Sequence, residues 1–132
     1  MLGPLAPVNT VAGRALRRSR PVGRGEFFLR CVTESLAQIA DHAPHALIGV
    51  DIGVEDVPDT TGAWSHRVPL AAAQDATPDT LARIVVFRRP IEHRASNRRQ
   101  LRSLVHRTLV EQVAALTGIP VTTLDPEGDD ED

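Results

Sequence analysis

The sequence predicts a single α+β domain in which two main helices pack on a small mixed sheet. The chain has 132 residues and 42% hydrophobic content, a size and composition that suit one domain with one core. Two segments carry apolar residues at helical spacing, and two others carry the patterns of buried strands. Aromatic residues make up only 3% of the chain, so the core should consist mainly of aliphatic side chains.

The first predicted helix begins at Glu26 and ends near Ala40. Its apolar residues recur at helical spacing, with Phe28 and Val32 beside the main positions, which are Phe27, Cys31, Leu36 and Ile39. Pro44 follows, and it ends the helix because it lacks an N–H and restricts the residue before it. Residues 1–24 show no sustained period and are rich in Gly, Pro and Arg, so they are predicted to form a flexible Arg-rich arm.

Two strands are predicted in the middle of the chain. In residues 46–58 apolar and small or acidic residues alternate, which is typical of a strand with one buried face; the apolar members are Ile48, Val50, Ile52 and Val54. In residues 82–89 the apolar residues are consecutive, so both faces of this strand are expected to be covered, and Pro90 should end it. The connection 58–82 is long enough to indicate a functional loop or a further short strand.

The longest predicted helix runs from Ser96 to Thr117. Asn97 and Gln100 have the spacing of a capping box at its start. Gly118 is suited to the position just beyond its last turn, and Pro120 cannot continue it. The α+β domain is therefore predicted over residues 25–119, and residues 120–132 are expected to form an acidic tail.

A helical projection places a polar side chain in the apolar stripe of this last helix. Gln112 falls at the centre of the stripe, Glu111 lies on its edge, and His106 points away. A buried amide without a partner costs about 1–3 kcal/mol, so Gln112 either bonds a backbone group of a neighbouring strand or borders a site. Glu111 and Ala115 are four residues apart and project from one side, which is the spacing of two metal-binding histidines with a carboxylate at position 112.

Four segments carry a resemblance to a known family: GPLAP at 3–7, RIVVFRRPIEHRA at 83–95, LVHRTLVEQVAALTGI at 104–119 and LDPEGDDED at 124–132. The chain resembles the minimal zincin-like metallopeptidases, in particular a divergent actinobacterial branch, and the likeness implies a zincin-like fold for residues 25–119. The family motif, His-Glu-x-x-His, would fall on residues 111–115. The likeness thus places the first histidine at Glu111, the catalytic glutamate at Gln112 and the second histidine at Ala115.

Three functions are compatible with this degenerate motif. Alanine cannot bind a metal and an amide is a poor proton acceptor, so the leading hypothesis is a catalytically inactive family member that acts as a binding or adaptor protein for a protein partner, without a cofactor. The second hypothesis is an active metallopeptidase in which histidines and Glu111 hold zinc unconventionally. The third is a nucleic-acid-binding module that uses the arginine-rich surfaces.

Charge is unevenly distributed although the net charge is only −2. All fifteen basic residues are arginines; five lie in residues 14–24, and six acids lie in residues 125–132. A second group of arginines surrounds the junction between the second strand and the last helix: Arg88, Arg89, Arg94, Arg98, Arg99, Arg102 and Arg107. Its candidates for phosphate binding are Arg94, Arg98, Arg99 and Arg102. The near-neutral total charge and the lack of aromatic residues for base stacking argue against nucleic-acid binding by these arginines. The alternative is that they form an ordinary solvent-exposed helix face.

Cys31 is the only cysteine, which excludes an intramolecular disulfide and a thiolate metal cluster. It is expected to be a small core residue of the first helix. The chain lacks an unbroken apolar run of membrane-spanning length and shows no secretory signal pattern, so we expect a cytoplasmic protein without a membrane partner. The histidines, His42, His45, His66, His93 and His106, are expected on the surface.

Overall fold

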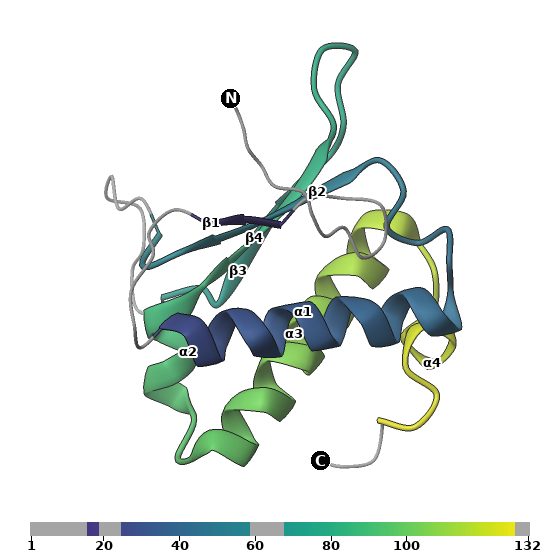
Figure 1. Cartoon of the computed structure of the whole chain (residues 1–132). Coiled ribbons are helices and arrows are strands. Elements are labelled where there is room, and N and C mark those ends of the chain that lie inside the picture. Colours follow the sequence, from purple (N-terminus) through teal and green to yellow (C-terminus); the bar gives the residue numbers. More distant parts are fainter. Residues whose placement is uncertain (1–15, 19–24, 59–67, 129–132) are drawn as a thin grey trace.

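A computed structural model describes residues 16–18, 25–58 and 68–128 of the chain (Figure 1). Four strands and four helices follow in the order β1 (Leu16–Arg18), α1 (Gly25–His42), β2 (Val50–Glu55), β3 (Ala71–Gln74), β4 (Ala82–Phe87), α2 (Arg88–Arg94), α3 (Arg98–Thr117) and α4 (Val121–Leu124). The predicted α+β class, with two main helices on a small mixed sheet, is confirmed.

The sheet has the strand order β1-β2-β4-β3. Strands β1, β2 and β4 are parallel, and β3 runs antiparallel to β4, with Ile52 and Ala73 both in register with Ile84. Strand β3 lies in the long connection where the sequence predicted either a functional loop or a short strand. Strand β1 lies within the segment predicted as an Arg-rich arm, and the remainder of that arm is outside the described residues.

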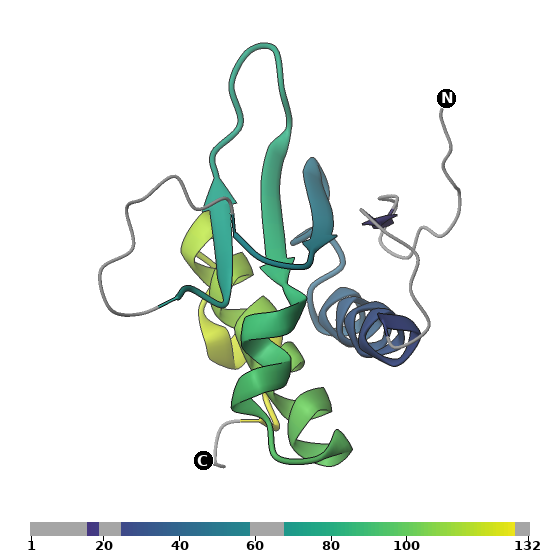
Figure 2. The same cartoon turned by 90° about the vertical axis from the view of Figure 1, so that its left-hand side faces the viewer.

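The helices lie on one side of the sheet (Figures 1 and 2). Alternate residues of β2 and β4 face them and are buried: Val50, Ile52, Val54, Ala82, Ile84 and Val86. On the other side of the sheet, Arg83 is partly exposed and forms two ion pairs. Its Nε lies 3.9 Å from Asp51 Oδ2, and its Nη2 lies 4.0 Å from Glu55 Oε2. The expectation that β4 is covered on both faces is therefore wrong for most of its length, because helices cover only one face.

The start of β2 also differs from the prediction. Gly49 has a φ of 78°, and the strand begins after it at Val50. A positive φ suits glycine because this residue has no Cβ. Ile48, which was expected to be buried in the strand, precedes this bend and is 70% exposed.

The long helix α3 has the predicted ends. The Asn97 side chain accepts a hydrogen bond from the Gln100 N–H at 2.8 Å, and the Gln100 side chain accepts one from the Ser96 N–H at 2.8 Å. Gly118 adopts a φ of 80° and donates its N–H to the Ala114 carbonyl at 2.9 Å. Both ends therefore satisfy backbone groups that a helix terminus would leave free.

Two short helices were not predicted from the sequence. Pro90 does end the β-structure, but it lies in the first turn of α2, where its missing N–H is not needed by the helix. Helix α4 follows α3, and its last residue, Leu124, is fully buried in the core. The predicted acidic tail 120–132 thus contributes to the core, and its residues 129–132 lie outside the described part of the chain.

Candidate functional site

The three positions that the resemblance assigned to the family motif differ in their exposure. Glu111 and Ala115 are exposed, and Gln112 is half-buried. Gln112 lies on the same face of the helix as the buried residues Val105 and Thr108, seven and four positions before it, but it is only partly buried. It does not occupy the fully buried position that the projection predicted.

These positions do not fit a zinc ion. Of the three, only Glu111 offers a side chain that binds zinc readily, because zinc prefers sulfur, imidazole and carboxylate ligands. Across residues 16–18, 25–58 and 68–128, no three His, Cys, Asp or Glu side chains come together in a group that could hold a metal. His42, His45 and His93 are exposed as predicted, and His66 lies outside the described residues.

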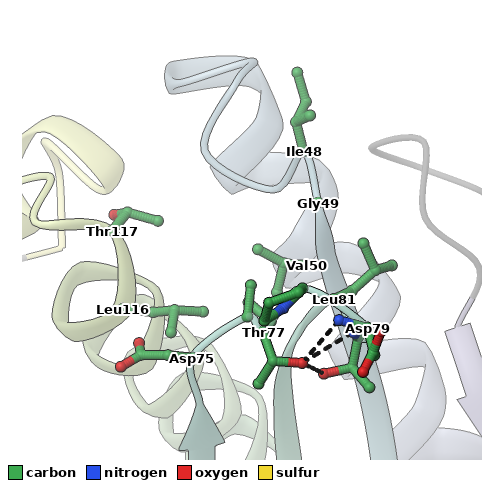
Figure 3. Close-up of a pocket in the computed structure, with 13 residues that line it drawn as sticks. Ile48, Gly49, Val50, Asp75, Thr77, Asp79, Leu81, Leu116 and Thr117 are labelled. Carbon is green, nitrogen blue, oxygen red and sulfur yellow. Dashed lines mark hydrogen bonds between the residues drawn. The ribbon is translucent and has the colours of Figure 1, made fainter.

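A groove of about 630 Å³ opens beyond the end of α3 (Figure 3). Three segments form it: the bend before β2, the loop between β3 and β4, and the last turn of α3. Helix α3 contributes Leu116 and Thr117, which directly follow motif position Ala115. The remaining lining residues are Ile48, Gly49, Val50, Asp75, Ala76, Thr77, Pro78, Asp79, Thr80, Leu81 and Ala82.

The groove combines exposed aliphatic side chains with carboxylates. Ile48 is 70% exposed and Leu81 is 47% exposed, and both belong to its lining. Large aliphatic side chains that are exposed close together commonly mark a contact surface. Asp75 and Asp79 supply negative charge, and the described lining residues include no basic side chain. The groove can therefore accept an aliphatic group that has a positive charge near it.

Hydrogen bonds fix the loop that forms one wall of the groove. Thr77 and Thr80 exchange backbone hydrogen bonds at 2.9 and 3.3 Å. The Thr77 Oγ1 also accepts the N–H groups of Asp79 and Thr80 at 3.2 and 3.0 Å (Figure 3). The wall thus has a defined shape before a ligand arrives, which lowers the ordering cost of binding.

His106 is not the surface histidine that the sequence predicted. Its Nδ1 lies 2.6 Å from the Ser35 Oγ of α1, and its Nε2 lies 3.2 Å from Asp125 Oδ2, which follows α4. The second contact is close but poorly aligned, so it is an electrostatic contact and not a hydrogen bond. Ser35 is only 2% exposed and does not line the groove, so this arrangement links three segments and gives no substrate access to a nucleophile.

The predicted arginine group separates into different roles. Arg88 is buried and forms ion pairs with Asp56 at 3.2 Å and Glu92 at 2.9 Å, which is a structural role. Arg94 and Arg99 are exposed. Arg98 and Arg102 lie over the Phe27 ring of α1, where Arg30 joins them. No pattern within one segment predicts this contact between two helices.

Cys31 is a buried core residue, as predicted. Burial raises the pKa of its thiol, and the nearby positive charge of Arg102 only partly opposes this effect. A protonated, inaccessible thiol is a poor nucleophile, so Cys31 is not a catalytic candidate.

Comparison with known proteins connects this fold to a protein family. The sequence model of a family described as zincin-like metallopeptidase matches residues 36–129, which include the end of α1, the groove and the whole of α3. No curated protein matches the chain. Of the helices in the described ranges, none has the length and apolar character that crossing a bilayer requires.

Proposed function

This chain belongs to the zincin-like metallopeptidase family, and we propose that it is a non-catalytic member that binds a segment of another protein. The observation that carries the proposal is the residue set at the three motif positions. Ala115 has no ligand atom, Gln112 cannot act as a carboxylate base, and Glu111 alone is too few ligands for a catalytic zinc ion. The family fold is thus retained around a helix that lacks the family chemistry.

The groove at the end of α3 supports a binding role. Ile48, Leu81 and Leu116 provide apolar contact area, while Asp75 and Asp79 provide negative charge at the same surface. The partner segment is therefore expected to present an aliphatic side chain with Arg or Lys beside it. Such anchor residues in a preformed groove provide most of the binding energy in protein interfaces.

Elemental analysis tests the loss of catalysis. We expect the purified protein to retain no stoichiometric zinc and to hydrolyse no peptide library in a zinc-supplemented buffer. A triple variant, E111H/Q112E/A115H, serves as the matched control. Its two histidines would lie four residues apart on one helix face, so it should bind zinc more tightly than the natural chain. Stoichiometric zinc that Glu111→Gln removes, with chelator-sensitive peptide hydrolysis, would overturn the proposal.

Peptide selection tests the groove. A random peptide library displayed on phage should yield ligands that combine aliphatic and basic residues. Ile48→Asp and Leu81→Asp should abolish their binding, while Val57→Asp, another exposed aliphatic position outside the groove, should not. Selected peptides that bind all three variants equally would show that the groove is not the binding surface.

A further inference from the structure

Three arginines surround one aromatic ring where α1 packs against the first turns of α3. The guanidinium carbon of Arg98 lies 4.4 Å from the Phe27 ring centroid, that of Arg102 lies 5.5 Å from it, and that of Arg30 lies 5.9 Å from it. Arg98 and Arg102 are one turn apart on α3, and Phe27 and Arg30 are one turn apart on α1. We call Phe27, Arg30, Arg98 and Arg102 the arginine cluster.

The cluster carries more positive charge than its neighbours neutralise. Glu34 forms an ion pair with Arg102, with 3.0 Å between Oε1 and Nε, and both side chains remain about half exposed. Within the described part of the chain, Arg30 and Arg98 form no ion pair. Among the described residues, the three guanidinium groups therefore have one carboxylate paired with them. The negative face of the Phe27 ring attracts each cation, but it does not remove their mutual repulsion.

The start of α3 adds to this positive field. Its first turn contains Arg98 and Arg99 and no acidic residue. The helix dipole places partial positive charge at the same end, where acidic side chains are normally favoured and arginines are not. The side chains of this turn thus oppose the preference of the helix dipole. An anion, which the described residues of the first turn do not supply, would stabilise the local arrangement.

The shape of the cluster indicates which anion fits. A guanidinium group stacked on a ring keeps its N–H edge free for paired hydrogen bonds to phosphate oxygens. The three groups gather around one point and do not form a long stripe, so they suit one phosphate group better than an extended polyanion. The net charge of −2 for the whole chain also disfavours a polynucleotide.

We propose that the arginine cluster binds a single phosphate group, either as inorganic phosphate or as the phosphomonoester of a small molecule. Arg98 and Arg102 from α3 and Arg30 from α1 contact its oxygens, and Phe27 holds the three side chains together. Glu34 competes with the ligand for Arg102 and limits the affinity.

Two ligand titrations of the full-length chain at low salt test the proposal. Two-dimensional NMR spectra recorded at each ligand concentration monitor the binding. One titration uses inorganic phosphate and the other a 5′-mononucleotide. Both should give saturable shifts at residues 27–31 and 98–102. Arg98→Gln and Arg30→Gln should each weaken binding about tenfold, because each removes charge-assisted hydrogen bonds. Glu34→Gln should strengthen binding several-fold, an effect that unfolding or general damage would not produce.

Arg107→Gln is the matched control, because Arg107 is an exposed arginine of α3 that does not contact Phe27. It should leave the affinity unchanged. Binding of phosphate alone would assign inorganic phosphate, and tighter binding of the mononucleotide would assign a phosphomonoester. Unsaturated shifts at millimolar ligand, or equal losses in the Arg98 and Arg107 variants, would overturn the proposal. It would also fail if an oligonucleotide without a terminal phosphate bound as tightly as the mononucleotide.

Discussion

His106 joins the two main helices to the segment that follows α4. It contacts Ser35 through one ring nitrogen and Asp125 through the other, at 2.6 and 3.2 Å. Ser35 is almost completely buried, so its hydroxyl depends on His106 for a hydrogen bond. A buried polar group that loses its partner retains the cost of desolvation without compensation. This chain therefore contains a polar link between three segments, and its role is structural.

Replacement of His106 should reveal this link in unfolding experiments. His106→Ala is expected to lower the free energy of unfolding by about 1–3 kcal/mol, because it leaves the Ser35 hydroxyl buried without a partner. Ser35→Ala with His106→Ala should cost less than the sum of the two single changes, since the two residues share one interaction. Urea unfolding of the natural chain, the two single variants and the double variant measures the coupling between the two residues. Strictly additive losses of unfolding free energy would contradict the prediction.

Cys31 should make the stability depend on pH at alkaline values. Burial raises the pKa of its thiol in the folded chain. Above the ordinary thiol pKa of about 8.5, the unfolded chain loses this proton while the folded chain keeps it, so stability falls as pH rises toward the folded pKa. The sequence contains no lysine and no tyrosine, so few other side chains titrate there. Denaturant unfolding between neutral and alkaline pH should show this slope, and Cys31→Ala should reduce it.

At the scale of elements, features set by neighbouring residues could be predicted, and features set by distant contacts could not. The ends of α3 followed from Asn97, Gln100 and Gly118, because capping depends on residues within one turn. Helix α2 does not follow from the sequence pattern, because Pro90 is compatible both with the end of a strand and with the first turn of a helix. Helix α4 has four residues, too few for a periodic pattern to be recognised.

The candidate site shows the same division. Helical spacing relates positions 111, 112 and 115 to one another on α3, but it could not tell how deeply each side chain would be buried. That depth depends on the elements that pack against α3, two of which, α2 and α4, are not predicted from the sequence. The groove, the His106 link and the arginine cluster all join residues that are distant in the sequence. A pattern within one segment carries no information about such contacts.

For the whole molecule, the segment after α3 completes the hydrophobic core. Leu124 is fully buried among residues of the core, whereas Val121, in the same short helix, is 41% exposed. Leu124→Ala should lower the free energy of unfolding by about 2–5 kcal/mol, because it creates a cavity. Val121→Ala should change it by no more than about 0.5 kcal/mol. Thermal or urea unfolding compares the two variants. Similar small losses of unfolding free energy in both would show that this segment does not support the core.

Helix α3 contacts the edge strand β3, its neighbour β4 and all three other helices. Five of the seven other elements therefore pack directly on this helix. Amide protons in its buried centre, from Val105 to Val113, should therefore exchange with solvent only when the entire domain unfolds. We expect the helix that carries positions 111, 112 and 115 to be the slowest-exchanging part of the described fold, so its exchange rate should report the stability of the domain.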